Sequence, residues 1–157
     1  MIPLSWMDRA LEEAAKGATQ GEVPVGAVLV QVRANTSSPD PKMIFQGHNQ
    51  VEATGNPLAH AEILAIQEGC RRLGTPFLST CDLYVTLEPC PLCASALSLA
   101  RVRRVIFGAF NPKGGGVDHG PQIFDHPSCL WRPEVLGGVR EEACQDLLKN
   151  FFKTLRS

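Results

Sequence analysis

Residues 82–100 read DLYVTLEPCPLCASALSLA, and they change character halfway along. Residues 82–87 combine leucine, valine, tyrosine and threonine, which is typical of a strand. Residues 91–100 are small and apolar on every side, which predicts a helix buried in the core. Pro91 suits the first turn of that helix. This stretch therefore predicts a strand that turns directly into a helix, with Cys90 at the turn.

Further elements are predicted on both sides of this unit. Helices are expected from an N-cap at Ser5 to about Gly17, over residues 59–72 and over residues 140–155. Strands are expected over residues 23–32, 43–48, 102–110 and 134–139, and loops over residues 34–41 and 112–133. Helices alternate with strands after an opening hairpin, which predicts an α/β fold with a mixed sheet. Residues 1–157 contain no internal repeat or linker, so we expect one domain.

The composition is that of an ordinary globular protein. The chain has 157 residues, of which 44% are hydrophobic and 20% charged. This balance excludes a disordered or fibrous chain, and no apolar run approaches the roughly 20 residues of a membrane helix. Residues 1–16 carry acidic side chains and do not resemble a secretory signal. We therefore expect a cytoplasmic protein whose six cysteines bind metal or do chemistry rather than form disulfides.

The formal net charge of -1 is unevenly distributed. Residues 1–100 carry 6 basic and 10 acidic side chains, whereas residues 101–157 carry 9 basic and 6 acidic ones. Phosphate binding depends on the local potential and not on the total charge. A small nucleic-acid footprint is therefore compatible with this chain, and we expect it in the C-terminal third.

Two short motifs carry the chemistry, and each is weak alone. A Cys-x-x-Cys pair at a helix start, as at Cys90 and Cys93, suits a metal ion, a redox dithiol or a buried core. His60 adds a third ligand, and a zinc ion held by one histidine and two cysteines keeps its fourth position open for catalysis. Glu62 stands where a proton-carrying carboxylate is needed. A dithiol oxidoreductase would leave His60 and Glu62 without a role, and a non-catalytic subunit would not need Glu62.

His-x-Glu followed downstream by Pro-Cys-x-x-Cys is the signature of zinc-dependent deaminases. Residues 22–27 (EVPVGA), 60–63 (HAEI), 86–90 (TLEPC), 107–109 (FGA) and 142–152 (EACQDLLKNFF) extend the match along the chain. The sequence resembles the bacterial tRNA-specific adenosine deaminases. This resemblance implies a three-layer cytidine deaminase-like fold, with a five-stranded mixed sheet flanked by helices, and a homodimer. It also implies conversion of adenosine to inosine at the wobble position of a tRNA anticodon stem-loop, with release of ammonia.

The resemblance also assigns residues to roles. Glu62 would move a proton from the zinc-bound water to the ring nitrogen beside the reacting carbon, and then to the departing amine. One Zn²⁺ per chain would be held by His60, Cys90 and Cys93. Substrate contacts are expected from Val25, Asn49 and Asn111, and from backbone groups around Ala61 and the turn of Leu87 and Glu88. RNA contacts are expected from Lys113, Phe151, Phe152, Lys153 and Arg156.

Several of these positions also have a plainer interpretation. From the residues alone, Asn49 also suits a turn, Lys113 a solvated loop, and one of the two phenylalanines the core. Asn111 stands where many members of the family carry Asp. Residues 34–41 look like an insertion, and residues 114–133 diverge from the common pattern. His119, His126 and Cys129 lie in that second segment, but their spacing fits no standard zinc motif.

The metal motif does not by itself select the substrate. The same fold serves deaminases of a free nucleobase or nucleoside, such as guanine, cytosine or adenosine. The length of the match and the basic, aromatic C-terminal helix favour RNA over a free base.

Overall fold

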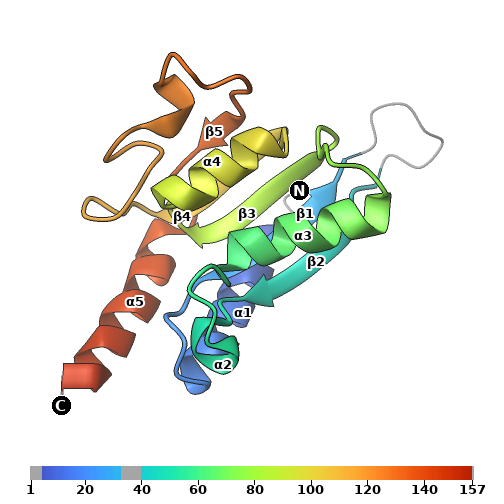
Figure 1. Ribbon diagram of the computed structural model, residues 1–157. Helices are drawn as coiled ribbons and strands as arrows, with labels where there is room; N and C mark the ends of the chain where they lie inside the picture. Colours follow the sequence, from blue (N-terminus) through green and yellow to red (C-terminus); the bar gives the residue numbers. More distant parts are fainter. Residues whose placement is uncertain (1–4, 33–39, 157) are drawn as a thin grey trace.

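Five strands form one sheet with the order β2-β1-β3-β4-β5 in the computed structural model, which describes residues 5–32 and 40–156 (Figure 1). β1 pairs antiparallel with β2 and β3, while β3–β4 and β4–β5 are parallel pairs. The expected five-stranded mixed sheet is thus confirmed. The predicted insertion at residues 34–41 falls outside the described residues except for its last two positions. The strands are β1 (Gly26–Gln31), β2 (Lys42–His48), β3 (Cys81–Leu87), β4 (Arg104–Ala109) and β5 (Glu134–Leu136).

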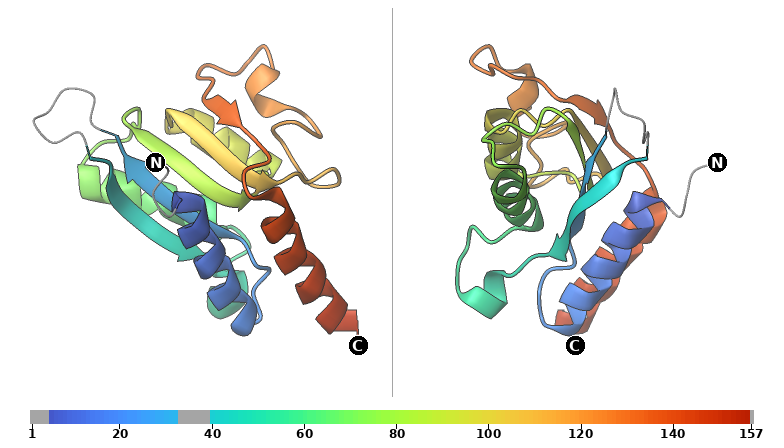
Figure 2. Two further views of the ribbon diagram at one scale, coloured as in Figure 1. Left: turned by 180° about the vertical axis from the view of Figure 1, so that it is seen from behind. Right: turned by 90° about the vertical axis from the view of Figure 1, so that its right-hand side faces the viewer.

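Helices cover both faces of this sheet, which gives the expected three layers (Figure 2). α3 (Ala61–Leu73) and α4 (Pro91–Leu99) pack on one face through small buried side chains such as Ala65 and Ala94. α1 (Trp6–Thr19) and α5 (Glu141–Arg156) pack on the other face around Met7, Ala10 and Cys144. The predicted α/β class and layer arrangement are confirmed.

Most expected elements lie where the sequence placed them, but several details differ. β4 and β5 are shorter than the predicted strands at residues 102–110 and 134–139. α1 begins at the predicted cap, where Ser5 Oγ accepts the Asp8 N–H at 3.2 Å, and it ends two residues later than expected. β1 is shorter than residues 23–32, because the Val25 N–H already donates to the Val23 carbonyl in a turn. The one-turn helix α2 (Val51–Thr54) and the 3₁₀ turn η1 (Ile123–Asp125) were not expected.

The prediction that residues 91–100 form a fully buried helix is wrong. The side of α4 that faces the sheet buries Cys93, Ala94 and Leu97. Its opposite side leaves Leu92 42% and Leu99 80% exposed. A helix that is apolar on every side has no polar face to mark the side that meets solvent. The sequence alone therefore does not show which side of α4 is exposed.

α5 lies close against the sheet at Gly108 of β4. A side-chain Cβ at this position would overlap the Cys144 sulfur of α5 and would stand 2.9 Å from the Thr86 carbonyl oxygen. Cys144 is the one residue of α5 that is fully buried, and Leu148 packs partly buried against the same core. The last turns of the helix continue past the sheet toward the C-terminus (Figure 1). The far end of α5 is therefore free to present side chains outward.

One edge of the sheet gathers the ends of several elements. The carboxyl ends of the parallel strands β3 and β4 meet there, followed by Glu88 and Phe110. The N-termini of α3 and α4, capped by His60 and Cys90, point to the same edge. Such an edge is where ligands bind in open α/β sheets. Within the two described ranges, no helix combines the length and the apolar character needed to cross a membrane.

Candidate active site

His60, Cys90 and Cys93 form a compact group of metal-binding side chains. His60 is the N-cap of α3, Cys90 is the N-cap of α4, and Cys93 lies in the first turn of α4. The His60 Nδ1 atom lies 3.6 Å from Cys90 Sγ and 3.4 Å from Cys93 Sγ. The three ligand atoms lie within 4.8 Å of one another. Strand β3 and two helix starts thus bring together residues that are 30 positions apart.

These distances fit a tetrahedral zinc ion. With Zn–S bonds of about 2.3 Å and Zn–N bonds of about 2.0 Å, neighbouring nitrogen and sulfur ligands lie about 3.5 Å apart. The observed separations of 3.4 and 3.6 Å match this spacing. Two thiolates and one imidazole are also the donors that zinc prefers. The three predicted ligands are brought together as expected, and they leave one tetrahedral position for water or substrate.

Without a bound ion, hydrogen bonds among His60, Cys90 and Cys93 shift the pKa values of these side chains. A hydrogen bond from the Cys93 thiol, together with one from His60, lowers the pKa of Cys90 to about 4. The Cys90 thiolate, with burial as the next cause, raises the pKa of Cys93. The hydrogen bond with Cys90 also raises the pKa of His60. One thiolate is therefore already present to receive a cation.

Glu62 lies beside the metal group without joining it. It belongs to the first turn of α3 and is only 4% exposed. Burial is the main reason why its pKa is raised from 4.5 to about 7, with a smaller contribution from the Cys90 charge. A carboxyl group with this pKa can both accept and release a proton near neutral pH. This is the behaviour expected of the predicted proton carrier.

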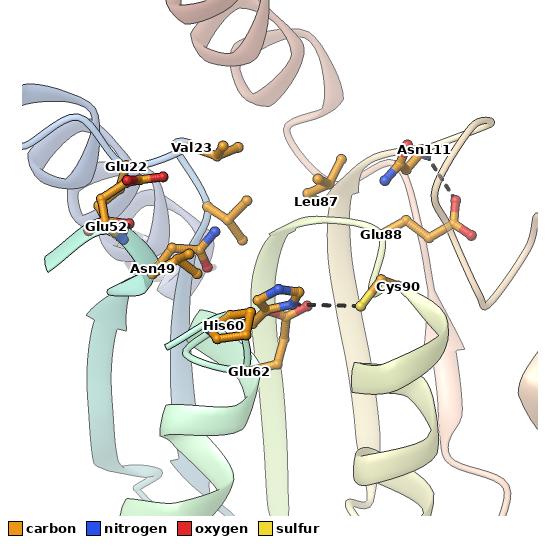
Figure 3. A pocket seen from close by; sticks show the side chains of 13 residues that line it. Glu22, Val23, Asn49, Glu52, His60, Glu62, Leu87, Glu88, Cys90 and Asn111 are labelled. Atoms are coloured by element: carbon orange, nitrogen blue, oxygen red, sulfur yellow. Dashed lines mark hydrogen bonds between the residues drawn. The ribbon is translucent and has the colours of Figure 1, made fainter. Parts of the chain in front are cut away.

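A pocket of about 350 Å³ opens directly above these groups (Figure 3). His60, Glu62 and Cys90 form its floor. The α2 segment lies on one side of the pocket, and the loop that starts at Asn111 lies on the other. Of the predicted substrate residues, only Ala61 does not line the pocket. Of the predicted metal ligands, only Cys93 does not line it. The lining residues are Glu22, Val23, Val25, Asn49, Val51, Glu52, Pro57, His60, Glu62, Leu87, Glu88, Cys90 and Asn111.

Asn49 links the pocket to the metal-bearing helix. Its Oδ1 atom accepts the backbone N–H of Ala61 at 2.8 Å, and its own N–H donates to the Val25 carbonyl. The Ala61 backbone thus takes part through its N–H group, and this hydrogen bond fixes the start of α3 next to His60. The Asn49 amide nitrogen points into the pocket and can donate a hydrogen bond there (Figure 3).

Glu22 holds the wall opposite Asn111, and sequence reasoning missed this role. Its buried carboxylate accepts the backbone N–H groups of Glu52 at 3.0 Å and Ala53 at 2.8 Å. These are orphan N–H groups at the start of the one-turn helix α2. The sequence indicates Glu22 only as part of the EVPVGA match. The one available signal was an acidic residue inside an otherwise apolar stretch.

The residues expected to touch RNA lie outside the pocket. Phe151 is half-buried and packs edge-to-face with the exposed Phe152, with ring centroids 5.4 Å apart. Lys153 and Arg156 are exposed on the same end of α5. Lys113 is exposed in the loop that follows Asn111. The structure thus leaves these side chains available at the surface without joining them to the metal group.

His119, His126 and Cys129 have separate hydrogen-bond partners in residues 114–133 and in the rest of the fold. His119 Nδ1 contacts Glu88 at 2.8 Å, His126 Nδ1 contacts the Ser128 hydroxyl at 2.8 Å, and the Cys129 thiol donates to the Trp131 carbonyl. Among the described residues, only His60, Cys90 and Cys93 form a metal-binding group. The six cysteines all lie in the described part of the chain, and none of them forms a disulfide there.

Comparison with known proteins agrees with this site. Residues 3–109 match the family model for the cytidine and deoxycytidylate deaminase zinc-binding region. The chain is 46% identical over 148 residues to a tRNA-specific adenosine deaminase of Aquifex aeolicus, covering 94% of this chain and 92% of that protein. It is 44% identical over 151 residues to the tRNA-specific adenosine deaminase of Bacillus subtilis, covering 96% and 89%.

Solved structures extend the comparison to the fold. A structure from a study of A-to-I editing by tRNA:A34 deaminases superimposes with a TM-score of 0.84 at 41% identity, covering 91% of this chain and 98% of that one. The guanine deaminase of Nitrosomonas europaea has a TM-score of 0.77 at 22% identity, covering 95% and 84%, and shares the fold alone. Identity above 40% along nearly the whole chain shows that this protein belongs to the tRNA-specific adenosine deaminase family.

Proposed function

We propose that this protein is a hydrolase that deaminates adenosine to inosine at the wobble position of a tRNA anticodon and releases ammonia. The observation that carries the proposal is the buried Glu62 beside a three-ligand metal group on the floor of an open pocket. Zinc in this group would supply an activated water molecule for attack on the purine carbon. Each of the remaining tasks falls to side chains of this chain.

Glu62 is assigned the proton transfers. Its carboxylate takes a proton from the attacking water and gives it to the ring nitrogen beside the reacting carbon. It then takes the remaining proton from the added hydroxyl and delivers it to the amine, and the carbon–nitrogen bond breaks to release ammonia. A pKa near 7 supports both directions of transfer, because the group is neither permanently charged nor permanently neutral at the pH of the cell.

The upper pocket is assigned to the base and its sugar. Asn49 is a candidate to donate from its amide nitrogen to an acceptor on the purine, since Ala61 already occupies its oxygen. Val25 and Leu87 offer apolar contacts to the faces of the base. Asn111 lies on the opposite wall, where a ribose would leave the pocket.

RNA contacts beyond the target nucleotide are assigned to the surface. Phe152 is 42% exposed, and Lys153 and Arg156 flank it on α5. Exposed aromatic rings stack on unpaired bases, and lysine or arginine binds phosphate. Lys113 extends the same basic character to the pocket mouth. We place the enzyme in the cytoplasm, where mature tRNA is used.

We further propose that two copies of the chain form the homodimer that the family resemblance implies. The outer side of α4 supports this, because Leu92 and Leu99 are exposed there, and Phe77 and Leu130 are 43% and 99% exposed nearby. Exposed apolar side chains grouped in this way are typical of an interaction surface. Light scattering should therefore give about twice the chain mass of 17.0 kDa, and a monomeric mass would contradict the proposal.

A side-by-side assay tests the reaction. An anticodon stem-loop with adenosine at the wobble position, free adenosine, guanine and cytosine are offered to the purified enzyme, and inosine or ammonia is measured. We expect turnover of the stem-loop. Turnover of a free base without turnover of the RNA would replace this function by that of a nucleobase deaminase.

A pair of variants on one helix tests the role of Glu62. Glu62→Ala should keep about one zinc per chain, measured by elemental analysis, and lose deamination, because the residue carries protons without binding metal. Glu68→Ala removes a half-exposed carboxylate that pairs with Arg71 on the same helix, and it should retain activity. Loss of zinc in Glu62→Ala, or retained activity, would contradict the assignment.

A further inference from the structure

The side chain of Glu88 is the centre around which the loop of residues 111–119 folds. It is only 1% exposed, yet it belongs to the turn between β3 and Cys90. Its Oε1 atom accepts the Asn111 N–H at 3.0 Å. Its Oε2 atom accepts the N–H groups of Val117, Asp118 and His119 at 3.2, 2.9 and 3.0 Å. Successive backbone N–H groups that converge in this way form an anion-binding nest.

A fifth donor comes from the imidazole ring of His119. Its Nδ1 atom lies 2.8 Å from Glu88 Oε1, and because a carboxylate only accepts, Nδ1 carries the hydrogen. Four backbone N–H groups and one imidazole N–H thus converge on this carboxylate, and both of its oxygens are fully used within the protein.

The loop is fitted closely to this carboxylate. A Cβ at Gly115 would overlap Glu88 Oε2 and would stand 2.7 Å from the Asn111 carbonyl oxygen. Only glycine lets the backbone pass at this distance. The Gly116 N–H donates to the Pro89 carbonyl at 2.8 Å, which ties the same loop to the turn that carries Cys90.

This loop contributes one residue, Asn111, to the lining of the pocket. The Asn111 Oδ1 atom accepts the Gly114 N–H at 3.0 Å, so its side chain is fixed within the loop. Lys113 is exposed at the tip of the same turn. In Figure 3 the Glu88 side chain turns away from the metal floor and toward Asn111. The positions of Asn111 and Lys113 therefore depend on Glu88.

We propose that Glu88 and His119 are positioning residues, which hold residues 111–119 as the RNA-facing wall of the pocket without touching the reacting atoms. This role of the side chain is separate from the contact expected from the backbone of the Leu87–Glu88 turn, and neither carboxylate oxygen is left for a ligand. The inference rests on the proposed function for its kinetic readout. It assigns His119, a residue of the divergent segment, to substrate recognition.

Three variants separate positioning from chemistry. Glu88→Gln places an amide donor among N–H donors, so we expect KM for the stem-loop to rise about tenfold or more. We expect kcat to change less than about threefold, because the metal floor is untouched. His119→Ala removes one of five donors and should raise KM by about threefold. His119→Asn should restore a KM near that of the wild type, because its amide can donate from about the position of Nδ1.

Asp118→Asn is the matched control. It changes a charge in the same loop, but the residue contributes only its backbone N–H to Glu88, and its side chain is exposed. We expect its KM to stay within about twofold of the wild-type value, as for most surface substitutions. A rise as large as that of Glu88→Gln would overturn the proposal, because loop charge alone would then explain the effect.

Amide hydrogen exchange gives a readout that does not need turnover. In Glu88→Gln, the amides of Asn111 and residues 117–119 should exchange at least about tenfold faster, while zinc content stays near one per chain. Unchanged exchange, or a fall in kcat with KM unchanged, would overturn the proposal. A loss of zinc in Glu88→Gln, together with an unchanged KM in His119→Ala, would also overturn the proposal. Glu88 would then only stabilise the fold.

The two proposals fail in different ways. If the wild-type enzyme does not deaminate the stem-loop, the proposed function is wrong. The exchange data then still decide whether Glu88 and His119 hold the wall. If the wild-type enzyme is active and the His119 variants behave alike, only the positioning role is lost.

Discussion

Glu62 should make the metal-free protein less stable as the pH rises, and Glu62→Gln should remove this effect. The side chain is 4% exposed, and its burial raises its pKa from 4.5 to about 7. One unit of pKa corresponds to about 1.4 kcal/mol, so this rise corresponds to about 3 kcal/mol of folding free energy. Glutamine has the same shape and remains neutral at every pH, which makes it the matched replacement.

The sign follows from which state loses its proton first. Between about pH 4.5 and pH 7 the unfolded chain has released the Glu62 proton while the folded chain retains it. The free energy of unfolding therefore falls as the pH rises through this window and levels off above it. Below about pH 4.5 the carboxyl is neutral in both states, so wild type and variant should be equally stable. At pH 8 the variant should be more stable by up to about 3 kcal/mol.

Urea unfolding in the presence of a chelator measures this difference directly. Midpoints are recorded between pH 4.5 and pH 8 for the wild type, for Glu62→Gln and for Glu12→Gln, which changes an exposed carboxylate of α1. The Glu12→Gln curve should parallel the wild type. A Glu62→Gln difference that is constant across this range, or a variant less stable than the wild type at pH 8, would refute the reasoning. It would mean that burial is not what sets the Glu62 pKa.

Three further substitutions test other parts of the structure. Glu22→Ala leaves the N–H groups of Glu52 and Ala53 without an acceptor and should cost about 1–3 kcal/mol in urea unfolding. Gly108→Ala forces a methyl group against Cys144 and should lower stability by about 1–3 kcal/mol, seen as a lower melting temperature. Lys153→Ala should weaken stem-loop binding and lower the slope of log affinity against log salt by about one, measured by fluorescence anisotropy.

The layers could be predicted from the sequence because each main element carries its own periodic pattern. The Ser5 cap and the run into Pro91 located two helix starts within a residue or two. Element ends were harder, since Val25 continues an apolar pattern but its N–H is used in a turn. α2 could not be found at all, because a four-residue helix has almost no periodicity. It is stabilised by Glu22, which lies 30 residues earlier in the chain.

The site also has a part that could be predicted from the sequence and a part that could not. His60, Glu62, Cys90 and Cys93 were predicted correctly as neighbours because metal chemistry restricts both residue types and spacing. The part played by the Glu88 side chain could not be predicted, because its partners are mainly backbone N–H groups. Every residue other than proline has such a group, so the sequence holds no trace of which ones a carboxylate will bind.

The floor and the walls of the pocket are held by different parts of the chain. The floor is fixed by two helix starts at the edge of the sheet. Both walls are short irregular segments, and each is held by a buried carboxylate, Glu22 on one side and Glu88 on the other. Loops tolerate changes of length and sequence that strands and helices do not. A wall anchored through its backbone can therefore change its side chains, as at Asn111, while the metal ligands remain in place.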